Sequence, residues 1–285
     1  MGKTRLAVLN TQPPHLYFGG VERRILETAK RLTKELDMTV YSGTKAGFKK
    51  PTKVNGLNVV PCFSTDLLFP LDNWSYSHTL ADSKNSIKAD VYEAHNASGH
   101  AFVKSLKKKT PNTPFIQTVH GLLADEYFRT LESGSLSLRD RLANLLTWQL
   151  SKLEAESARA ADFVAAVSKY SAKRATQLYN VDETKIRVAP NGVDPDRFKP
   201  AQNEEALRER FGLEQNKVVL FVGRLIPRKG LHFLVNTASQ IVKELENVKF
   251  VLVGDGPLRA HLESSLAALG LSKHFLFLGD VEEGI

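Results

Sequence analysis

The sequence predicts an α/β fold made of two domains, each built on a parallel sheet that helices cover. Short apolar runs typical of buried strands alternate with longer segments of helical periodicity, and this alternation favours right-handed strand-helix-strand units. The chain has 285 residues, more than one domain usually holds. The segment 189–200, APNGVDPDRFKP, is rich in turn residues, so we place the domain boundary there, with domains 1–190 and 191–285.

The first domain is expected to alternate seven short strands with helices. Helix 21–36 carries its apolar residues on one stripe, as a helix with one buried face does: Val21, Ile25, Leu26, Ala29 and Leu32. The expected strands are 5–10, 38–42, 57–63, 89–95, 114–120, 162–168 and 185–191, and the other helices are 100–109, about 137–159, and 169–180.

The second domain is expected to hold three strands and two helices. The strands are 218–224, 249–256 and 274–280, and the helices between them are 231–245 and 257–270. Three strands make a small sheet, whose outermost strand would be an exposed apolar edge.

Composition predicts a soluble, cytoplasmic protein. Cys62 is the single cysteine, so no internal disulfide can form, and a reducing compartment is expected. The start of the sequence has no signal-peptide core, and no apolar stretch is long enough to span a bilayer. The net charge is +8; residues 191–285 carry −1, and residues 1–190 therefore carry +9. This asymmetry indicates either an anionic partner for the first domain or a solvated basic face.

Two cationic residues lie at and beyond the end of the strand 218–224, in the stretch FVGRLIPRKG. Ligands of open parallel sheets bind outside the carboxyl ends of the strands, where Gly223 and Arg224 fall. Lys229 precedes the next helix, whose free N–H groups and dipole favour an anion. An arginine fork and a lysine charge fit a diphosphate, although an isolated pair of this spacing is more often an ordinary surface feature.

The first domain offers a second glycine loop and a histidine at strand ends. Gly19 and Gly20 join the first strand to the helix that begins at Val21, and they allow a ligand to approach the backbone closely. The pattern is not G-x-G-x-x-G, so a dinucleotide cofactor is disfavoured. His120 ends the strand 114–120, where it is either a ligand contact or a hydrogen-bonded structural group. It has no partner at metal-ligand spacing, and we predict no metal site.

These segments together resemble the retaining glycosyltransferases of family four (group 1 glycosyl transferases), which have the GT-B fold of two Rossmann-like domains. The resemblance covers essentially the whole chain, in order and at family-like spacing. It lies in FGGVERRILETAKRL (18–32), DVYEAHN (90–96), TVHG (118–121), ADFVAAVSKYSA (161–172), APNGVDPDRFKP (189–200), FVGRLIPRKG (221–230), LVGDGPL (252–258) and FLGDV (277–281).

The resemblance implies transfer of a sugar from a nucleotide-sugar, UDP- or GDP-linked, to an acceptor, without a metal or other cofactor. Arg224 and Lys229 would hold the donor diphosphate and offset the charge of the leaving group. In the second domain, Gly223 lies beside them, and Gly279 and Val281 would present backbone groups to the base.

From the first domain, the resemblance implies that His120 contacts the donor sugar. Gly19 and Gly20 would lie near the donor phosphate and the acceptor. Glu22 would face the acceptor, or would instead be a first-turn residue that interacts with the helix dipole.

One departure from the family concerns the second domain. The family carries an E-x7-E motif downstream of the strand that matches FLFLGD, and this sequence ends at Ile285 before such a motif. We therefore expect a truncated chain with an incomplete second domain, whose own transferase turnover is in doubt.

Other functions stay open at this point. One is a non-catalytic nucleotide-binding or partner-binding protein, and another is a sugar-nucleotide epimerase of the same fold. Nucleic acid is a disfavoured partner, because the basic residues show no regular aromatic interleaving.

Two segments of the first domain predict contact with an anionic membrane surface that carries a lipid-linked acceptor. The lysine-rich KSLKKK (104–109) and the amphipathic LRDRLANLLTWQLSKL (138–153) suggest peripheral binding at the inner face. The alternative is that the leucine stripe of 138–153 packs onto the first domain's own sheet.

Overall fold

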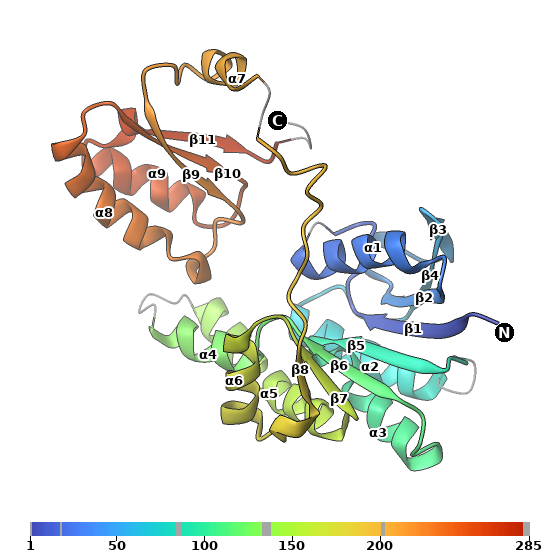
Figure 1. Ribbon diagram of the computed structural model, residues 1–285. Helices are drawn as coiled ribbons and strands as arrows, with labels where there is room; N and C mark the ends of the chain where they lie inside the picture. Colours follow the sequence, from blue (N-terminus) through green and yellow to red (C-terminus); the bar gives the residue numbers. More distant parts are fainter. Residues whose placement is uncertain (1, 18, 84–86, 133–137, 201–202, 282–285) are drawn as a thin grey trace. The chain divides into compact units, whose positions relative to one another are not determined.

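The computed structural model describes residues 2–17, 19–83, 87–132, 138–200 and 203–281 (Figure 1). The chain divides into two compact units, unit 1 up to Gly192 and unit 2 from Val193 onwards. Each unit has its own sheet and its own core, and each is described separately below.

Unit 1 is built on an eight-stranded sheet with the order β3-β4-β2-β1-β5-β6-β7-β8. All neighbouring strands are parallel except β3 and β4, which form an antiparallel pair at one edge. The strands are β1 (Thr4–Asn10), β2 (Leu36–Gly43), β3 (Thr52–Val54), β4 (Leu57–Cys62), β5 (Val91–His95), β6 (Phe115–Val119), β7 (Phe163–Ala166) and β8 (Ile186–Val188). The predicted α/β class with a parallel sheet is therefore confirmed.

Helices of unit 1 cover both faces of this sheet, as Figure 1 shows. They are α1 (Gly20–Leu32), α2 (Phe69–Ser83), α3 (His100–Lys109), α4 (Leu123–Glu132), α5 (Leu138–Ala160) and α6 (Lys169–Tyr179). The sequence analysis did not predict α2, because several of its buried positions are polar: Asp72, Asn73, Ser75 and Ser77. Polar residues on the buried face remove the hydrophobic periodicity by which such a helix is found.

Two cores fill unit 1, one on each face of the sheet. Adjacent residues of β1 enter different cores, because successive side chains of a strand point to opposite faces. Val8 packs in the core that Ile25 and Ala29 of α1 cover, and Leu9 packs in the larger core with Phe102. The apolar stripe predicted for α1 is thus confirmed.

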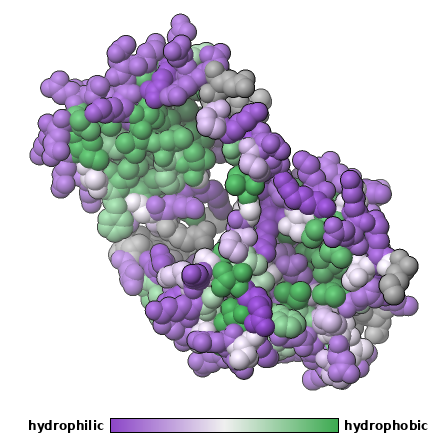
Figure 2. Space-filling model, viewed as in Figure 1, coloured by the Kyte–Doolittle hydropathy of each residue, from purple (hydrophilic) through white to green (hydrophobic). Residues whose placement is uncertain are grey.

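Unit 2 has a three-stranded parallel sheet with the order β11-β10-β9. Its elements are β9 (Lys217–Val222), β10 (Val248–Val253), β11 (Phe275–Gly279), α7 (Glu204–Arg210), α8 (Leu231–Glu244) and α9 (Arg259–Ala268). Helices α8 and α9 supply Leu231 and Leu262 to a core around Phe250. Leu220 and Val222 of β9 remain 61% and 69% exposed, and Figure 2 shows apolar side chains gathered over this unit's sheet.

The segments expected to meet a membrane are engaged only in part within unit 1. Lys104 pairs with Glu156, and Lys107 Nζ lies 2.6 Å from Asp162 Oδ2. On α5, Leu153 packs against a small cluster of buried residues, Ala97, Leu123 and Leu150, none of which belongs to a strand. Leu142 and Leu145 are 57% and 52% exposed, and the side chain of Leu138 lies outside the described residues. None of the described helices is long and apolar enough to cross a bilayer, and the peripheral contact stays a prediction.

A buried carboxylate, Glu154 of α5, holds the first turn of α4. Its Oε2 accepts a hydrogen bond from the backbone N–H of Leu123 at 3.0 Å and another from the hydroxyl of Tyr179. Its Oε1 is buried and has no hydrogen-bond partner. Burial, partly offset by these two hydrogen bonds, raises the pKa of Glu154 from 4.5 to about 7.

We predict that Glu154→Gln removes a pH dependence of unit 1 stability. Between pH 4.5 and about 7 the unfolded chain releases a proton that the folded chain keeps. The wild-type free energy of unfolding therefore falls as the pH rises through this window, by up to about 3 kcal/mol. Urea unfolding followed by tryptophan fluorescence reports on unit 1 alone, because Trp74 and Trp148 are the two tryptophans of the chain. The Gln variant should be more stable than the wild type at about pH 8 and similar at about pH 5.

The matched control is Glu156→Gln on the same helix. Glu156 is about 41% exposed, and its hydrogen bond to Lys104 lowers its pKa, so its small contribution is lost as the pH falls. A Glu154→Gln variant with the same pH profile as the wild type would contradict the assignment.

Candidate active site

The carboxyl ends of β1, β5 and β6 lie next to one another at one edge of the unit 1 sheet. Leu9 pairs with Ala94, and His95 pairs with Thr118, so the loops that follow these strands leave from adjacent positions. This edge receives Asn10, His95 and His120, the three polar groups that end or follow the strands. Ligands of parallel sheets bind at such an edge.

Two histidines form a pair at this edge. Nδ1 of His95 lies 2.9 Å from Nε2 of His120, and His95 is only 3% exposed. Burial is the main cause that lowers the pKa of both imidazoles to about 3; the positive charge of Arg24 contributes for both rings, and the neighbouring His95 contributes for His120. Both rings are therefore neutral at physiological pH. In the sequence, His95 belongs to the motif DVYEAHN, which did not by itself indicate a role for this histidine.

Hydrogen bonds hold the backbone around His120. The N–H of His120 donates to Oδ1 of Asn96 at 3.2 Å, and Asn96 has a positive φ of 50°, which asparagine tolerates. Gln117 donates its amide to the carbonyl of Asn96 and accepts a hydrogen bond from Ser157 at 2.6 Å. His120 is thus placed by a loop that is itself fixed by buried polar contacts.

Arg24 brings a positive charge from α1 toward this edge. Its Nη1 donates to Oδ1 of Asn191 at 3.1 Å, and Asn191 belongs to the PNGVD segment at the end of unit 1. Within the described parts of the chain, no carboxylate pairs with Arg24. The positive charge of Arg24 lowers the pKa of both His95 and His120.

The two glycines of the first loop differ in their surroundings. Helix α1 begins at Gly20 rather than at Val21, and Gly19 is its N-cap residue. A Cβ on Gly19 would lie 2.1 Å from Oε2 of Glu22, whereas a Cβ on Gly20 would have no atom within 4 Å. The space above Gly19 is thus filled by a carboxylate, and Gly20 is the glycine whose surroundings are open.

Glu22 turns back onto the glycine loop. It is 3% exposed, and its Oε1 lies 3.2 Å from the amide Nδ2 of Asn10, which donates to it. Burial raises the pKa of Glu22, and its hydrogen bonds to its own backbone N–H and to Asn10 oppose that rise. These contacts hold the carboxylate of Glu22 inside the protein. They do not test the predicted contact of Glu22 with an acceptor.

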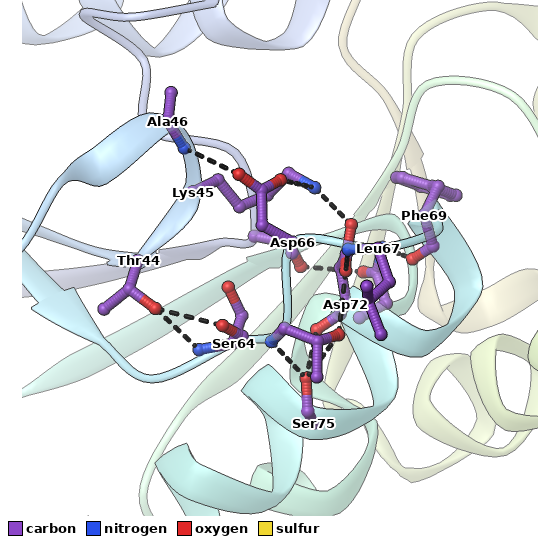
Figure 3. A network of polar contacts seen from close by, with 12 residues as sticks. Thr44, Lys45, Ala46, Ser64, Asp66, Leu67, Phe69, Asp72 and Ser75 are labelled. Carbon is purple, nitrogen blue, oxygen red and sulfur yellow. Dashed lines mark hydrogen bonds and ion pairs between the residues drawn. The ribbon is translucent and has the colours of Figure 1, made fainter.

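A buried ion pair organises the neighbouring corner of the edge, beyond β2 and β4 (Figure 3). Lys45 and Asp72 are 7% and 1% exposed and pair with each other, and Nζ of Lys45 also lies 3.1 Å from Asp66. Oδ1 of Asp72 accepts from Thr65 Oγ1 at 2.8 Å and from the N–H of Leu67 at 3.0 Å. Asp72 thereby fixes the loop that leads into α2. The buried polar face of α2 thus has a structural role.

In unit 2, the predicted diphosphate residues follow β9. Gly223 has a φ of 154°, and its N–H donates to the carbonyl of Val253 at 2.9 Å. Arg224 and Lys229 are exposed, and among the described residues neither side chain pairs with a carboxylate. Cε of Lys229 lies 3.9 Å from the position of a Cβ on Gly223, so Lys229 returns to the end of the strand. Gly230, at a φ of 70°, is the N-cap residue of α8.

Two further glycines support this loop and were not predicted as site residues. A Cβ on Gly254 would lie 2.3 Å from the carbonyl oxygen of Gly223, and one on Gly256 would lie 2.5 Å from that of Leu225. The VGDGP segment thus lets the loop after β10 pack directly against the backbone that carries Arg224. The spacing of these glycines in the sequence was the available signal.

The predicted base-binding residues lie at the end of β11. The carbonyl of Gly279 accepts a hydrogen bond from the N–H of Gly254 at 2.7 Å, and Gly279 has a φ of 68°. Val281 is half-buried at the end of the described residues. Gly223 and Gly279 are therefore hydrogen-bonded to adjacent residues at the end of β10, Val253 and Gly254, at the same edge of the unit 2 sheet.

Comparison with known proteins identifies the family. The family described as "Glycosyltransferase Family 4" matches residues 18–197, and "Glycosyl transferases group 1" matches residues 203–284. The chain belongs to Glycosyltransferase Family 4. Across the described residues of this family member, no three His, Cys, Asp or Glu side chains gather closely enough to hold a metal ion.

Several curated relatives are glycosyltransferases. The 2-deoxystreptamine glucosyltransferase of Streptomyces kanamyceticus is 41% identical over 33% of this chain and 25% of its own length. An uncharacterized glycosyltransferase of Methanocaldococcus jannaschii is 31% identical over 68% of this chain and 47% of its own length. The chain thus spans less than two thirds of the length of these relatives.

Solved structures show the same fold. Anabaena HepE in complex with UDP and glucose has a TM-score of 0.70 at 20% identity, over 98% of this chain and 70% of that one. WaaG, a glycosyltransferase of lipopolysaccharide biosynthesis, has a TM-score of 0.69 at 16% identity, over the same shares of the two chains. These likenesses confirm the GT-B fold.

We predict that Gly19→Ala displaces the carboxylate of Glu22 and weakens unit 1. The new Cβ would overlap Oε2 of Glu22, so the contact with Asn10 is lost. The expected cost is about 1–2 kcal/mol in the free energy of unfolding, measured by urea unfolding with tryptophan fluorescence.

Gly20→Ala is the matched control, one residue away in open space. It should leave unit 1 unchanged or stabilise it by up to about 1 kcal/mol, because alanine favours a helix more than glycine. Equal effects of the two substitutions would show that Glu22 does not occupy the position above Gly19.

Proposed function

We propose that this chain binds a nucleotide-sugar, UDP- or GDP-linked, and transfers its sugar to an acceptor with retention at the anomeric carbon. The observation that carries the proposal is the exposed pair Arg224 and Lys229 at the carboxyl end of β9. Neither cation is engaged by a carboxylate within the described residues, so both are available to an anion.

The loop after β9 suits a diphosphate for electrostatic and geometric reasons. Lys229 lies beside Gly223, and Gly254 and Gly256 keep the loop close to the strand ends. Cations in fixed positions stabilise the charge that develops on a leaving diphosphate, and they need no reorganisation as it departs. We propose that these side chains do this work without a metal ion or other cofactor.

The names of relatives support the nature of the donor. HepE structures contain UDP, UDP-glucose, or UDP and glucose. A relative in Mycolicibacterium smegmatis is named as a GDP-mannose-dependent mannosyltransferase. A relative in Escherichia coli is named as a galactosyltransferase that uses UDP-Gal and a diphosphoundecaprenol acceptor. We extend from these names only the class of donor, a sugar linked to a nucleoside diphosphate.

The proposed contribution of unit 1 is neutral hydrogen bonding. Burial keeps His120 uncharged, so it suits a sugar hydroxyl better than a phosphate. Gly20 leaves open space at the start of α1, where unpaired backbone N–H groups favour a polar ligand.

We predict that Arg224→Ala with Lys229→Ala lowers the affinity for UDP or GDP by about 100-fold or more. Each hydrogen bond to a charged group contributes about 1.5–3 kcal/mol, and the two cations should act on the same diphosphate. Isothermal titration calorimetry measures the affinity directly, and circular dichroism confirms that the variant is folded.

Lys217→Ala is the matched control, because Lys217 is an exposed lysine at the opposite, amino end of β9. It should leave nucleotide affinity within about twofold of the wild type, apart from weak long-range screening effects. Unchanged affinity in the folded double variant would refute the diphosphate assignment. Nucleotide binding without any sugar transfer would favour a non-catalytic binding protein.

A further inference from the structure

His95 and His120 form a hydrogen bond between two neutral imidazoles, and such a bond constrains where the protons are. One ring must supply an N–H and the other a lone pair. The 2.9 Å contact joins Nδ1 of His95 to Nε2 of His120. Two arrangements are therefore open: His120 donates from Nε2, or His95 donates from Nδ1.

The carboxylate of Glu93 distinguishes these arrangements. Oε1 of Glu93 lies 3.9 Å from Nε2 of His95, and it accepts a hydrogen bond from Thr118 at 2.6 Å, which fixes its position. A proton on Nε2 of His95 is attracted by this carboxylate, whereas a lone pair there is repelled. His95 thus carries its proton on Nε2 and offers the lone pair of Nδ1 to His120.

This proton arrangement decides the state of the other ring nitrogen of His120, Nδ1. With its proton on Nε2, His120 has a bare lone pair on Nδ1. Within the described residues, Nδ1 of His120 makes no hydrogen bond, and it is not among the fully buried unsatisfied atoms. It is therefore accessible, and it acts as a hydrogen-bond acceptor.

We propose that His95 is a positioning residue that holds His120 in the Nε2–H tautomer, so that Nδ1 of His120 accepts a hydrogen bond from a ligand hydroxyl. A phosphate or carboxylate oxygen offers only lone pairs and is rejected by a bare nitrogen. This inference rests on the proposed function for the identity of the ligand, a sugar, but the tautomer itself is a property of the free protein.

The surroundings keep both rings in the neutral state that this arrangement needs. His95 is 3% exposed, so an imidazolium there would lose its hydration. Arg24 places a positive charge near both rings, which also opposes protonation. The backbone N–H of His120, bound to Asn96, fixes the residue from which the ring extends.

The first test is NMR of the full chain labelled with ¹⁵N-histidine, without substrate. The His120 signals, assigned with a His120→Ala variant, should show Nε2–H over Nδ1–H by at least about ten to one, the ratio that one ordinary hydrogen bond gives. Its Nε2–H proton should be protected from exchange with solvent. A proton on Nδ1 of His120 in the wild type would overturn the inference, whatever the His95 variants show.

Two substitutions of nearly equal shape then test the role of His95. His95→Asn keeps an acceptor oxygen close to the position of Nδ1 and should retain the protected Nε2–H of His120. His95→Leu removes the acceptor, so protection should be lost and the tautomer ratio should relax toward that of a free imidazole. Retention of the protected proton in the Leu variant would overturn the assignment.

Kinetics distinguish positioning from general support of the fold. In sugar transfer, His95→Leu should lower kcat by about tenfold, and His95→Asn should stay within about threefold of the wild type. In a His120→Ala background, His95→Leu should add little, because it acts through His120. A full tenfold further loss there would contradict positioning. Failure of the wild type to transfer any sugar would count against the proposed function, while the NMR result would still decide the tautomer.

Discussion

Parallel pairing of the strands is the constraint on which the candidate site depends. A parallel strand must be followed by a crossing back to the starting edge, so the carboxyl ends of all such strands meet at one edge. In unit 1 the adjacency of β1, β5 and β6 brings Asn10, His95 and His120 to one short stretch of that edge. In unit 2 the adjacency of β9, β10 and β11 brings Gly223, Gly254 and Gly279 to one edge, where Gly223 donates to the carbonyl of Val253 and Gly254 donates to the carbonyl of Gly279.

Burial of polar groups gives the unit 1 edge its electrostatic character. Buried polar groups must find partners inside the protein, and each partner fixes an orientation as it lowers the cost of burial. Asn10 orients Glu22 at 3.2 Å, and His120 orients His95 at 2.9 Å. The same burial opposes ionisation, which raises the pKa of Glu22 and lowers the pKa of His95. Burial thus explains both the fixed orientation of Glu22 and His95 and the shifts in pKa that oppose their ionisation.

The sequence predicted the fold and named candidate site positions, but it did not reveal the contacts between them. Hydrophobic periodicity predicted α1, whose buried stripe is apolar, and failed for α2, where Asp72 is buried through its pairing with Lys45. The motifs placed His120 at a strand end, but the pair with His95 depends on the register of β5 with β6, which a single sequence does not reveal. The lysines of α3 appeared free in the sequence because their acidic partners lie about 50 residues further along the chain.

The two units thus supply different chemistry from the same kind of edge. The unit 2 edge offers Arg224 and Lys229, exposed cations whose charge is fully available to an anion. At the unit 1 edge, the buried groups Glu22 and His95 are bound to neighbours, and burial works against their charge. The difference between the two edges therefore follows from which polar groups each sheet buries: exposed cations suit an anion, whereas buried groups that resist ionisation suit a hydrogen-bonding partner without charge.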